Sequence, residues 1–432
     1  MNEELLSYYW KLQRFQKDAL CTTDGEPIQV IYPGLLNQDA GPDFLHARIR
    51  ISDTLWVGNV ELHTKSSDWL KHGHDEDPVF DSIILHVVYE SDVEFNKSFP
   101  ELELKEFIDA DNLHLVESWR TSMDPIPCSG LLQDRPEALS PLWLERLLVE
   151  RLEMKSKRIE ALLVETNKDW EATFYQFIAH YFGLRVNALP FEIVSRATPW
   201  RVVRKHQPKR EELEALLMGQ AGFLQQPTMD GFYSSLKDRY RFMKERHQLV
   251  PMQAVHWKFL RLRPANFPTI RLSQFADFLF SMESPLNTFL SCTNLREMES
   301  LLEVRANEYW QSHSKFGLPN RGLSGEMGAA TRQLLLGNAI LPFLFVYAEH
   351  WSLPDKREWV LDAFHQLRPE DNALIRRWKS LGIKARSFGE SQSLFVLSKS
   401  YCEQKRCLNC EVGNRLLKKE PKIIFLPEDS TS

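Results

Sequence analysis

The sequence has little cysteine, only six residues in 432, and this number is far too small for a disulfide-stapled scaffold. It also lacks a positively charged leader, because the start MNEELLSYYWKLQRF carries acidic residues and no long apolar core. Its longest strongly apolar run, residues 339–348, contains a proline and falls short of a membrane span of about 20 residues. We therefore expect a cytoplasmic protein with reduced thiols, a buried helix at 339–348 and no membrane partner.

An excess of positive charge is missing as well, since the net charge is -6. This balance argues against a protein coated with basic charge for non-specific nucleic-acid binding, although a locally basic groove stays compatible with it. A hydrophobic fraction of 43% and a charged fraction of 26% exclude a mostly disordered chain. The length predicts roughly two or three domains at ~150 residues each.

Periodicity near the N-terminus predicts strands. Residues 44–51 alternate between apolar and polar side chains, which is typical of a strand with one wetter face. A turn then leads into a second strand, LWVGNVELHTK at 55–65, and residues 82–90 are apolar on both faces, like a central, doubly covered strand. A helical spacing of apolar residues precedes these strands.

Beyond Pro125 the pattern is predominantly helical, for example at 141–165, where leucines recur at helical intervals. The expected fold class is α+β, with a mixed α/β core followed by a mostly helical region. The expected domains are 1–124 for the α/β core, 125–400 for the helical region and 401–432 for a cysteine-containing tail.

The α/β region holds a polar cluster that fits a divalent cation. Asp43 ends the loop PGLLNQDAGPD at the entrance of the first alternating strand, and Glu61, His63 and Lys65 point to one face of the next strand. Carboxylate oxygens suit Mg²⁺ or Mn²⁺, and a histidine can bind the metal or position a water. These four residues are the predicted catalytic residues, with Asp43 and Glu61 as metal ligands.

The pattern resembles the PD-(D/E)XK nuclease superfamily, in which an aspartate is followed about ten to twenty residues later by Glu-x-Lys on a neighbouring strand. Pro42-Asp43 and Glu61-Leu62-His63 occupy the matching positions, and His63 stands where the superfamily usually has lysine. The resemblance implies a restriction-nuclease-like core that hydrolyses the phosphodiester bonds of nucleic acid.

A second resemblance covers nearly the whole chain. The stretches GLLNQDAGPDF, GNVELHTKSSDWLKHGHDEDPVFDSIILHVVYESD, RPANFPTIRLSQFA and CLNCEVGNRLL are similar to a bacterial family defined by a domain of unknown function. This resemblance implies a family without assigning an activity.

Further histidines lie close to the polar cluster in sequence. His72 and His74 are separated by one residue and predict a transition-metal site, with a polar turn as the alternative. His86 lies within an apolar strand, which favours a core histidine that donates to a backbone carbonyl. A zinc-dependent hydrolase of a small substrate, using Glu61, His63, His72 and His74, is therefore a further hypothesis.

Three of the six cysteines, Cys402, Cys407 and Cys410, fall within nine residues. This spacing predicts a Zn²⁺ site or an iron–sulfur cluster, and a fourth ligand has to come from upstream. We favour Cys128 over Cys21, Cys292 or a histidine. A non-catalytic binding protein that carries such a cysteine-ligated centre is the alternative to the nuclease hypothesis.

Two basic stretches interrupt the acidic background and make nucleic acid a candidate partner. A solvated, charge-balanced surface is the alternative interpretation. The predicted nucleic-acid contacts are Arg201, Arg204, Lys205 and Arg406. The sequence does not predict an oligomeric state.

Overall fold

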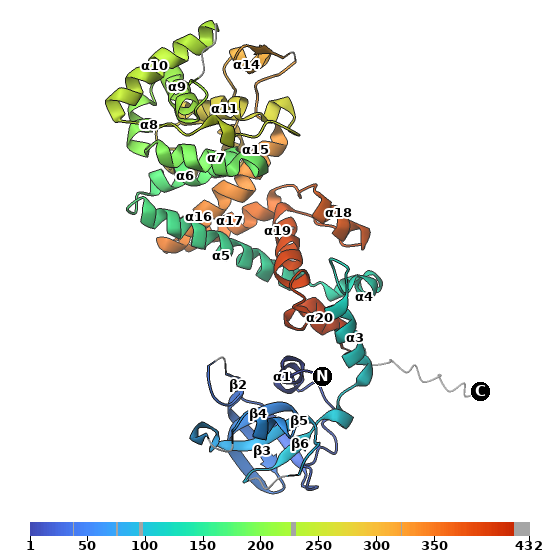
Figure 1. The fold of residues 1–432 in the computed structure, drawn as a ribbon. Coiled ribbons are helices and arrows are strands. Elements are labelled where there is room, and N and C mark those ends of the chain that lie inside the picture. The colour runs from blue at the N-terminus through green and yellow to red at the C-terminus, as the bar shows by residue number, and fades with distance from the viewer. Residues whose placement is uncertain (38, 75–76, 95–97, 226–229, 321, 419–432) are drawn as a thin grey trace, which may run out of the picture. The chain divides into compact units, whose positions relative to one another are not determined.

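The computed structural model describes residues 1–418, apart from positions 38, 75–76, 95–97, 226–229 and 321 (Figure 1). It divides the chain into two compact units, of which unit 1 comprises Met1–Ser140 with Leu397–Ser432 and unit 2 comprises Pro141–Val396. These limits differ from the expected ones at 124 and 401, because the chain returns to unit 1 at Leu397. Within the expected tail, residues 419–432 lie outside the described part.

Unit 1 is built on a six-stranded mixed sheet in the order β1-β3-β4-β5-β6, with β2 paired to β3. The strands β1, β3 and β4 are antiparallel, and β5 and β6 continue from β4 in parallel. The bounds are β1 Ile28–Tyr32, β2 Leu35–Leu36, β3 Phe44–Ile51, β4 Thr54–Lys65, β5 Ile83–Glu90 and β6 Glu101–Glu103. The strands predicted at 44–51, 55–65 and 82–90 are confirmed, and the fold is mixed α+β.

Burial explains the order of these strands. The first six residues of β5 are buried on both faces, as expected for a central strand. In β3, buried and exposed residues alternate over most of the strand, so one face meets the core. A bulge lies between Phe44 and Ala47, where His46 adopts φ 60°, and it bends β3 next to the polar loop that carries Asp43.

The opening helix α1, Glu3–Lys11, begins where the side chain of Asn2 accepts a hydrogen bond from the Leu5 amide. It buries Leu6 and Trp10 and packs against β4. The remaining helical segments of unit 1 are α2 Asp68–Lys71, η1 Pro78–Phe80, η2 Lys105–Phe107, α3 Ala110–Thr121, α4 Ser129–Asp134, η3 Pro136–Ala138, η7 Leu397–Cys402, η8 Cys407–Asn409 and α20 Glu411–Leu416.

Unit 2 is almost entirely helical and encloses a large apolar core, which includes the fully buried Phe174, Phe278 and Trp310. Its helices are α5 Pro141–Glu165, α6 Trp170–Phe182, α7 Leu184–Ala197, α8 Trp200–His206, α9 Arg210–Gln220, α10 Gly231–His247, α11 Pro268–Ser281, α12 Pro285–Ser291, α13 Leu295–Ser300, α14 Tyr309–Ser312, α15 Ala329–Leu335, η6 Leu336–Ile340, α16 Leu341–His350, α17 Pro354–Gln366, α18 Ala373–Ser380 and α19 Phe388–Val396. The short segments are η4 Ala254–His256, η5 Pro264–Asn266, β7 His313–Lys315 and β8 Leu318–Pro319.

One helical stretch of the described residues, Ala329–His350, is long and apolar enough to cross a membrane by length and composition alone. Most of it is buried inside unit 2, where Leu341, Phe343 and Leu344 are fully enclosed. The buried helix predicted at 339–348 is confirmed as part of this longer stretch.

A buried lysine supports the same stretch. Pro342 has no amide hydrogen for the carbonyl four residues before it, that of Asn338. Lys155 Nζ from α5 donates to this carbonyl oxygen (2.9 Å) and to Asn338 Oδ1 (3.0 Å). Burial holds the pKa of Lys155 well below its usual value. Burial therefore favours the neutral amine, which still donates these hydrogen bonds.

Candidate metal centre

Asp43 and Glu61 meet because of the register between β3 and β4. Phe44 lies opposite Val60 in this antiparallel pair, so Asp43, just before β3, comes beside Glu61. The Asp43 amide donates to Glu61 Oε2 (3.0 Å), and the Leu62 amide donates to Asp43 Oδ2 (3.0 Å). The two predicted carboxylates thus lie together where β3 begins.

Both carboxyl groups hold protons more tightly than they do in water. Burial raises the pKa of Asp43 to about 6, against the hydrogen bond from the Leu62 amide. Burial, and then the charge of Asp43, raises the pKa of Glu61 to about 8. The exposed Glu3 of α1 adds a smaller increase to the pKa of both groups. Such a carboxylate pair is a region of negative charge that a divalent cation neutralises.

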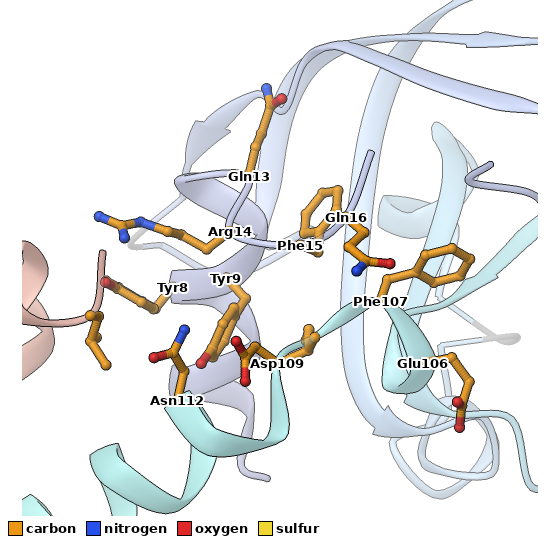
Figure 2. Close-up of a pocket in the computed structure, with 12 residues that line it drawn as sticks. Tyr8, Tyr9, Gln13, Arg14, Phe15, Gln16, Glu106, Phe107, Asp109 and Asn112 are labelled. Carbon is orange, nitrogen blue, oxygen red and sulfur yellow. The ribbon is translucent and has the colours of Figure 1, made fainter. Parts of the chain in front are cut away.

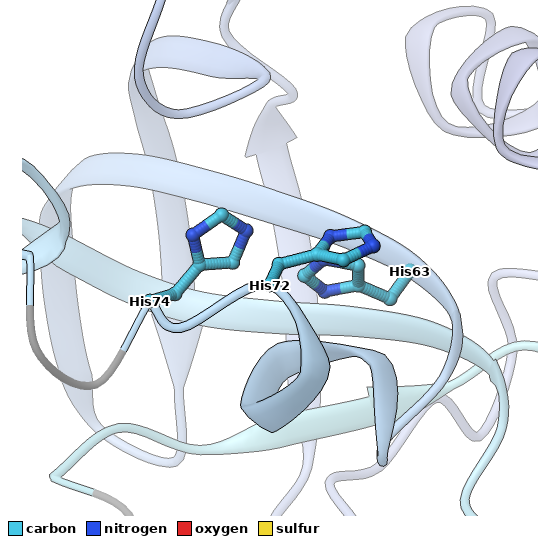
Figure 3. Close-up of side chains that lie close together, drawn as sticks. All are labelled: His63, His72 and His74. Carbon is cyan, nitrogen blue, oxygen red and sulfur yellow. The ribbon is translucent and has the colours of Figure 1, made fainter.

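Three imidazoles, one from β4 and two from the turn after α2, lie close together (Figure 3). One ring nitrogen each of His63, His72 and His74 lies within 4.8 Å of the others. Glu61 Oε1 lies 3.4 Å from His74 Nε2 and 3.9 Å from His63 Nε2. Nitrogen and oxygen ligands at this spacing can surround one cation.

A chain of hydrogen-bonding groups leads from β6 to this cluster, and we call Glu101, His86 and His63 the histidine relay. Glu101 Oε2 lies 2.9 Å from His86 Nδ1, and His86 Nε2 lies 2.9 Å from His63 Nδ1. Because a carboxylate only accepts, Nδ1 of His86 carries a hydrogen, and a neutral His86 then accepts from His63 Nδ1. This order leaves the lone pair of His63 on Nε2, which faces His72 Nδ1 at 3.0 Å.

Further side chains contact the histidine relay and hold it in place. Glu101 Oε1 accepts hydrogen bonds from the hydroxyls of Ser66 (2.8 Å) and Ser91 (2.7 Å), and Trp69 packs edge-on against the rings of His63 and His86. Burial, followed by the neighbouring histidines, lowers the pKa of His63 to about 3. His63 is therefore neutral at physiological pH, and the acceptor on its Nε2 faces His72 Nδ1.

Sequence reasoning missed Glu101, Glu3 and the partners of His86. His86 is buried as predicted, but its ring meets Glu101 and His63 instead of the expected backbone carbonyl. The parallel register places Glu61 opposite His86, and His86 opposite Glu101, so three polar residues form a row across the sheet. The signal in the sequence was the presence of polar residues in otherwise apolar strands.

Lys65 is exposed at the end of β4, where the parallel register places it opposite Glu90. Its backbone amide donates to Asp68 Oδ2 (3.1 Å), which also accepts from the Thr64 hydroxyl. The structure thus brings Asp43, Glu61 and His63 together with His72 and His74. Lys65, in contrast, is exposed at the end of β4.

The predicted cysteine ligands all belong to unit 1. Cys128 precedes α4, Cys402 ends η7, Cys407 begins η8 and Cys410 precedes α20, and each of the four is buried. Of the other two candidates, Cys21 is exposed and belongs to unit 1, whereas Cys292 belongs to unit 2.

The predicted nucleic-acid contacts lie on two elements. Arg201, Arg204 and Lys205 are exposed on α8, and Lys205 borders a hollow of about 780 Å³ together with His247 of α10. Arg406 is exposed in unit 1 and lies over the ring of Tyr401 at 5.1 Å. The hollow is lined by Lys205, Lys209, Arg239 and Arg246 and also by Glu212 and Asp238, so its lining carries an excess of positive charge.

Figure 2 shows a second hollow, of about 490 Å³, in unit 1. Tyr9 of α1 lies beside Asp109 and Asn112 at the start of α3, whereas the Arg14 guanidinium donates to the Asn414 carbonyl oxygen (3.3 Å). Among the described residues that line it, none belongs to the predicted site.

The family model described as "Protein of unknown function (DUF2851)" matches residues 3–373. No curated protein and no solved structure matches the chain. The matched residues run from the start of α1 to the start of α18 and include Asp43, Glu61 and the four histidines, whereas Cys402, Cys407 and Cys410 lie beyond them.

Proposed function

The chain belongs to the DUF2851 family, and we propose, from the residues of the site, that unit 1 is a divalent-metal-dependent nuclease that hydrolyses phosphodiester bonds of nucleic acid. One observation carries the proposal: Asp43 and Glu61 lie at adjoining positions of the β3–β4 pair, and Glu61 contacts His74, which belongs to the group of the His63, His72 and His74 imidazoles. The pattern Pro-Asp at a strand entrance and Glu-x-His on the next strand, similar to that of the PD-(D/E)XK superfamily, supports it.

Each residue of the site has a proposed role that follows from its chemistry. Asp43 and Glu61 would hold Mg²⁺ or Mn²⁺ through carboxylate oxygens, the ligands that these cations prefer. Such a cation, when bound, supplies positive charge to the phosphate oxygens and acidifies a water. Since the pKa of His63 is about 3, this imidazole is a weak base, and its proposed role is to accept a hydrogen bond and orient the attacking water.

Contacts to the nucleic-acid backbone are proposed for Arg201, Arg204, Lys205 and Arg406, which are all exposed. Lysine and arginine at the surface contribute to affinity through phosphate contacts that weaken with salt. Substitution of Lys205 by alanine is expected to reduce the slope of affinity against salt concentration, measured by fluorescence anisotropy with labelled DNA.

The direct test is cleavage of single- and double-stranded DNA and RNA by the purified protein with Mg²⁺ or Mn²⁺. We expect Glu61→Ala to abolish cleavage, because the cation loses a carboxylate ligand from a site that has two. Glu106→Gln is the matched control, since Glu106 is an exposed carboxylate of the same unit. Full cleavage by the Glu61→Ala protein would contradict the assignment of the site.

The close grouping of His63, His72 and His74 favours a second candidate, a zinc-dependent hydrolase of a small substrate. The two candidates differ in measurable ways. Zinc bound at these histidines, without affinity for nucleic acid, supports the second candidate, whereas Mg²⁺- or Mn²⁺-dependent cleavage of nucleic acid supports the first.

A further inference from the structure

Four buried cysteines of unit 1 come from two parts of the chain that are far apart in sequence. Cys128 belongs to the segment that leaves the sheet, and Cys402, Cys407 and Cys410 belong to the segment that returns after unit 2. Each thiol-bearing side chain is at most 9% exposed.

Lys405 fastens these two segments together. Its Nζ donates to the carbonyl oxygens of Ser122 (2.6 Å) and Asp124 (3.3 Å), just upstream of Cys128. Asp124 in turn accepts hydrogen bonds from the Ile126 amide (2.8 Å) and the Ser129 hydroxyl (3.0 Å), which flank the cysteine. The loop before α4 is thereby held against the loop between Cys402 and Cys407.

The loop from Cys407 to Cys410 has a defined shape. The Cys410 amide donates to the Cys407 carbonyl oxygen (3.3 Å), and Asn414 Nδ2 donates to the carbonyl oxygens of Leu408 and Cys410 (both 2.9 Å). Gly413 fits directly against this loop, since a Cβ there would lie 2.2 Å from the Cys407 carbonyl oxygen. A tight turn that fixes two thiols is what a metal-binding Cys-x-x-Cys loop requires.

The elements that carry the four cysteines are neighbours in unit 1. Helix α20 packs against α4 and against η8, and η7 packs against η8. Because Cys128 precedes α4, Cys402 ends η7, Cys407 begins η8 and Cys410 precedes α20, these contacts bring the four thiols to one part of unit 1.

We infer that Cys128, Cys402, Cys407 and Cys410 are the four thiolate ligands of one metal centre, which fastens the returning segment to unit 1. A zinc ion and an iron–sulfur cluster share this donor set of four thiolates. The exposed Cys21 does not belong to it. The centre is separate from the cluster around Asp43 and Glu61 and has a structural role.

The test is the metal content of the full chain, purified without chelators and under nitrogen. We expect about one zinc per chain in a colourless protein, or about two to four irons with a visible absorption band. Cys128→Ser and Cys407→Ser are each expected to lower this content by about tenfold or more. Cys21→Ser is the matched control and retains it.

The His72→Ala variant distinguishes zinc at the histidines from zinc at the cysteines, because it retains the cysteine-bound metal. Glu61→Ala keeps it too, whether or not the wild type cleaves nucleic acid, so this inference and the proposed nuclease fail independently. Absence of both metals from the wild type, or full metal content in Cys128→Ser, overturns the inference.

A measurement on the wild type tests the inference without depending on the folding of the serine variants. A thiol-specific mercurial is added stepwise, and the released metal is followed with a colorimetric chelator. We expect release to accompany the reaction of four thiols per chain, since all four hold the metal. Metal release that is complete before those thiols react also overturns the inference.

Discussion

Replacing Glu61 by glutamine is expected to stabilise unit 1 while it removes the metal site. The pKa of Glu61 is about 8 in the folded chain, against its usual 4.5. Between these values the folded state binds the extra proton, so stability is fully present below pH 4.5 and declines as pH rises toward 8. The glutamine of the Glu61→Gln variant keeps the shape of the side chain and has no proton to lose.

The size of the effect follows from the shift. One pKa unit corresponds to about 1.4 kcal/mol, and pH 7 lies about 2.5 units above 4.5, so holding on Glu61 a proton that the unfolded chain releases costs unit 1 roughly 3 kcal/mol at pH 7. Asp43, with a pKa of about 6, contributes its own decline at lower pH and remains in both proteins. The comparison is therefore cleanest between pH 6 and 8.

Hydrogen exchange of the β4 and β5 amides, read by mass spectrometry, reports on unit 1 without unit 2. In EDTA, we expect the wild type to lose up to about 1.4 kcal/mol per pH unit across this range and Glu61→Gln to lose much less. With Mn²⁺ at about 100 times its dissociation constant, the wild type alone should gain about 2.7 kcal/mol. Equal pH slopes in EDTA for the two proteins would refute the reasoning, and Glu106→Gln should behave as the wild type does.

Three further predictions concern the surroundings of the sites. Glu101→Gln is expected to lower metal affinity at the histidines about tenfold to a hundredfold, because the histidine relay loses the carboxylate that fixes it; unchanged affinity in a metal-competition assay would count against the relay. Stability of unit 2 is expected to rise from pH 7.5 toward 10, because the depressed pKa of Lys155 makes its contribution complete only above the unfolded value of 10.5. Hydrogen exchange in α5 should show this rise, and Lys155→Met should remove it. Gly413→Ala is expected to destabilise the returning segment by about 1–3 kcal/mol through contact with the Cys407 carbonyl, whereas Gly130→Ala, with open space around it, should not; equal proteolysis rates for the two variants would contradict this.

The sequence was informative where the relevant contacts are local. The hairpin of β3 and β4 follows from alternation and a short turn, and its register alone brings Asp43 beside Glu61. The buried helix at 339–348 and the Cys-x-x-Cys loop are likewise defined by residues that are neighbours in the sequence.

These local patterns do not predict which strands pair over long distances in the sequence. The parallel alignment of β4, β5 and β6 places His86 opposite Glu101, and nothing in either strand specifies that register. The same holds for the charge of Glu3, which raises the pKa of these carboxyl groups because α1 packs against β4. The return of the chain to unit 1 at Leu397 is likewise a tertiary event that no local composition marks.

The return at Leu397 has a consequence for synthesis on the ribosome. The strands of unit 1 emerge first, but the segment that carries three of its four buried cysteines emerges only after the whole of unit 2. At about 5–20 residues per second, unit 1 waits on the order of tens of seconds for its last part. A stop codon between Val396 and Cys402 would therefore remove part of unit 1, which is translated earlier, and leave the residues of unit 2 complete.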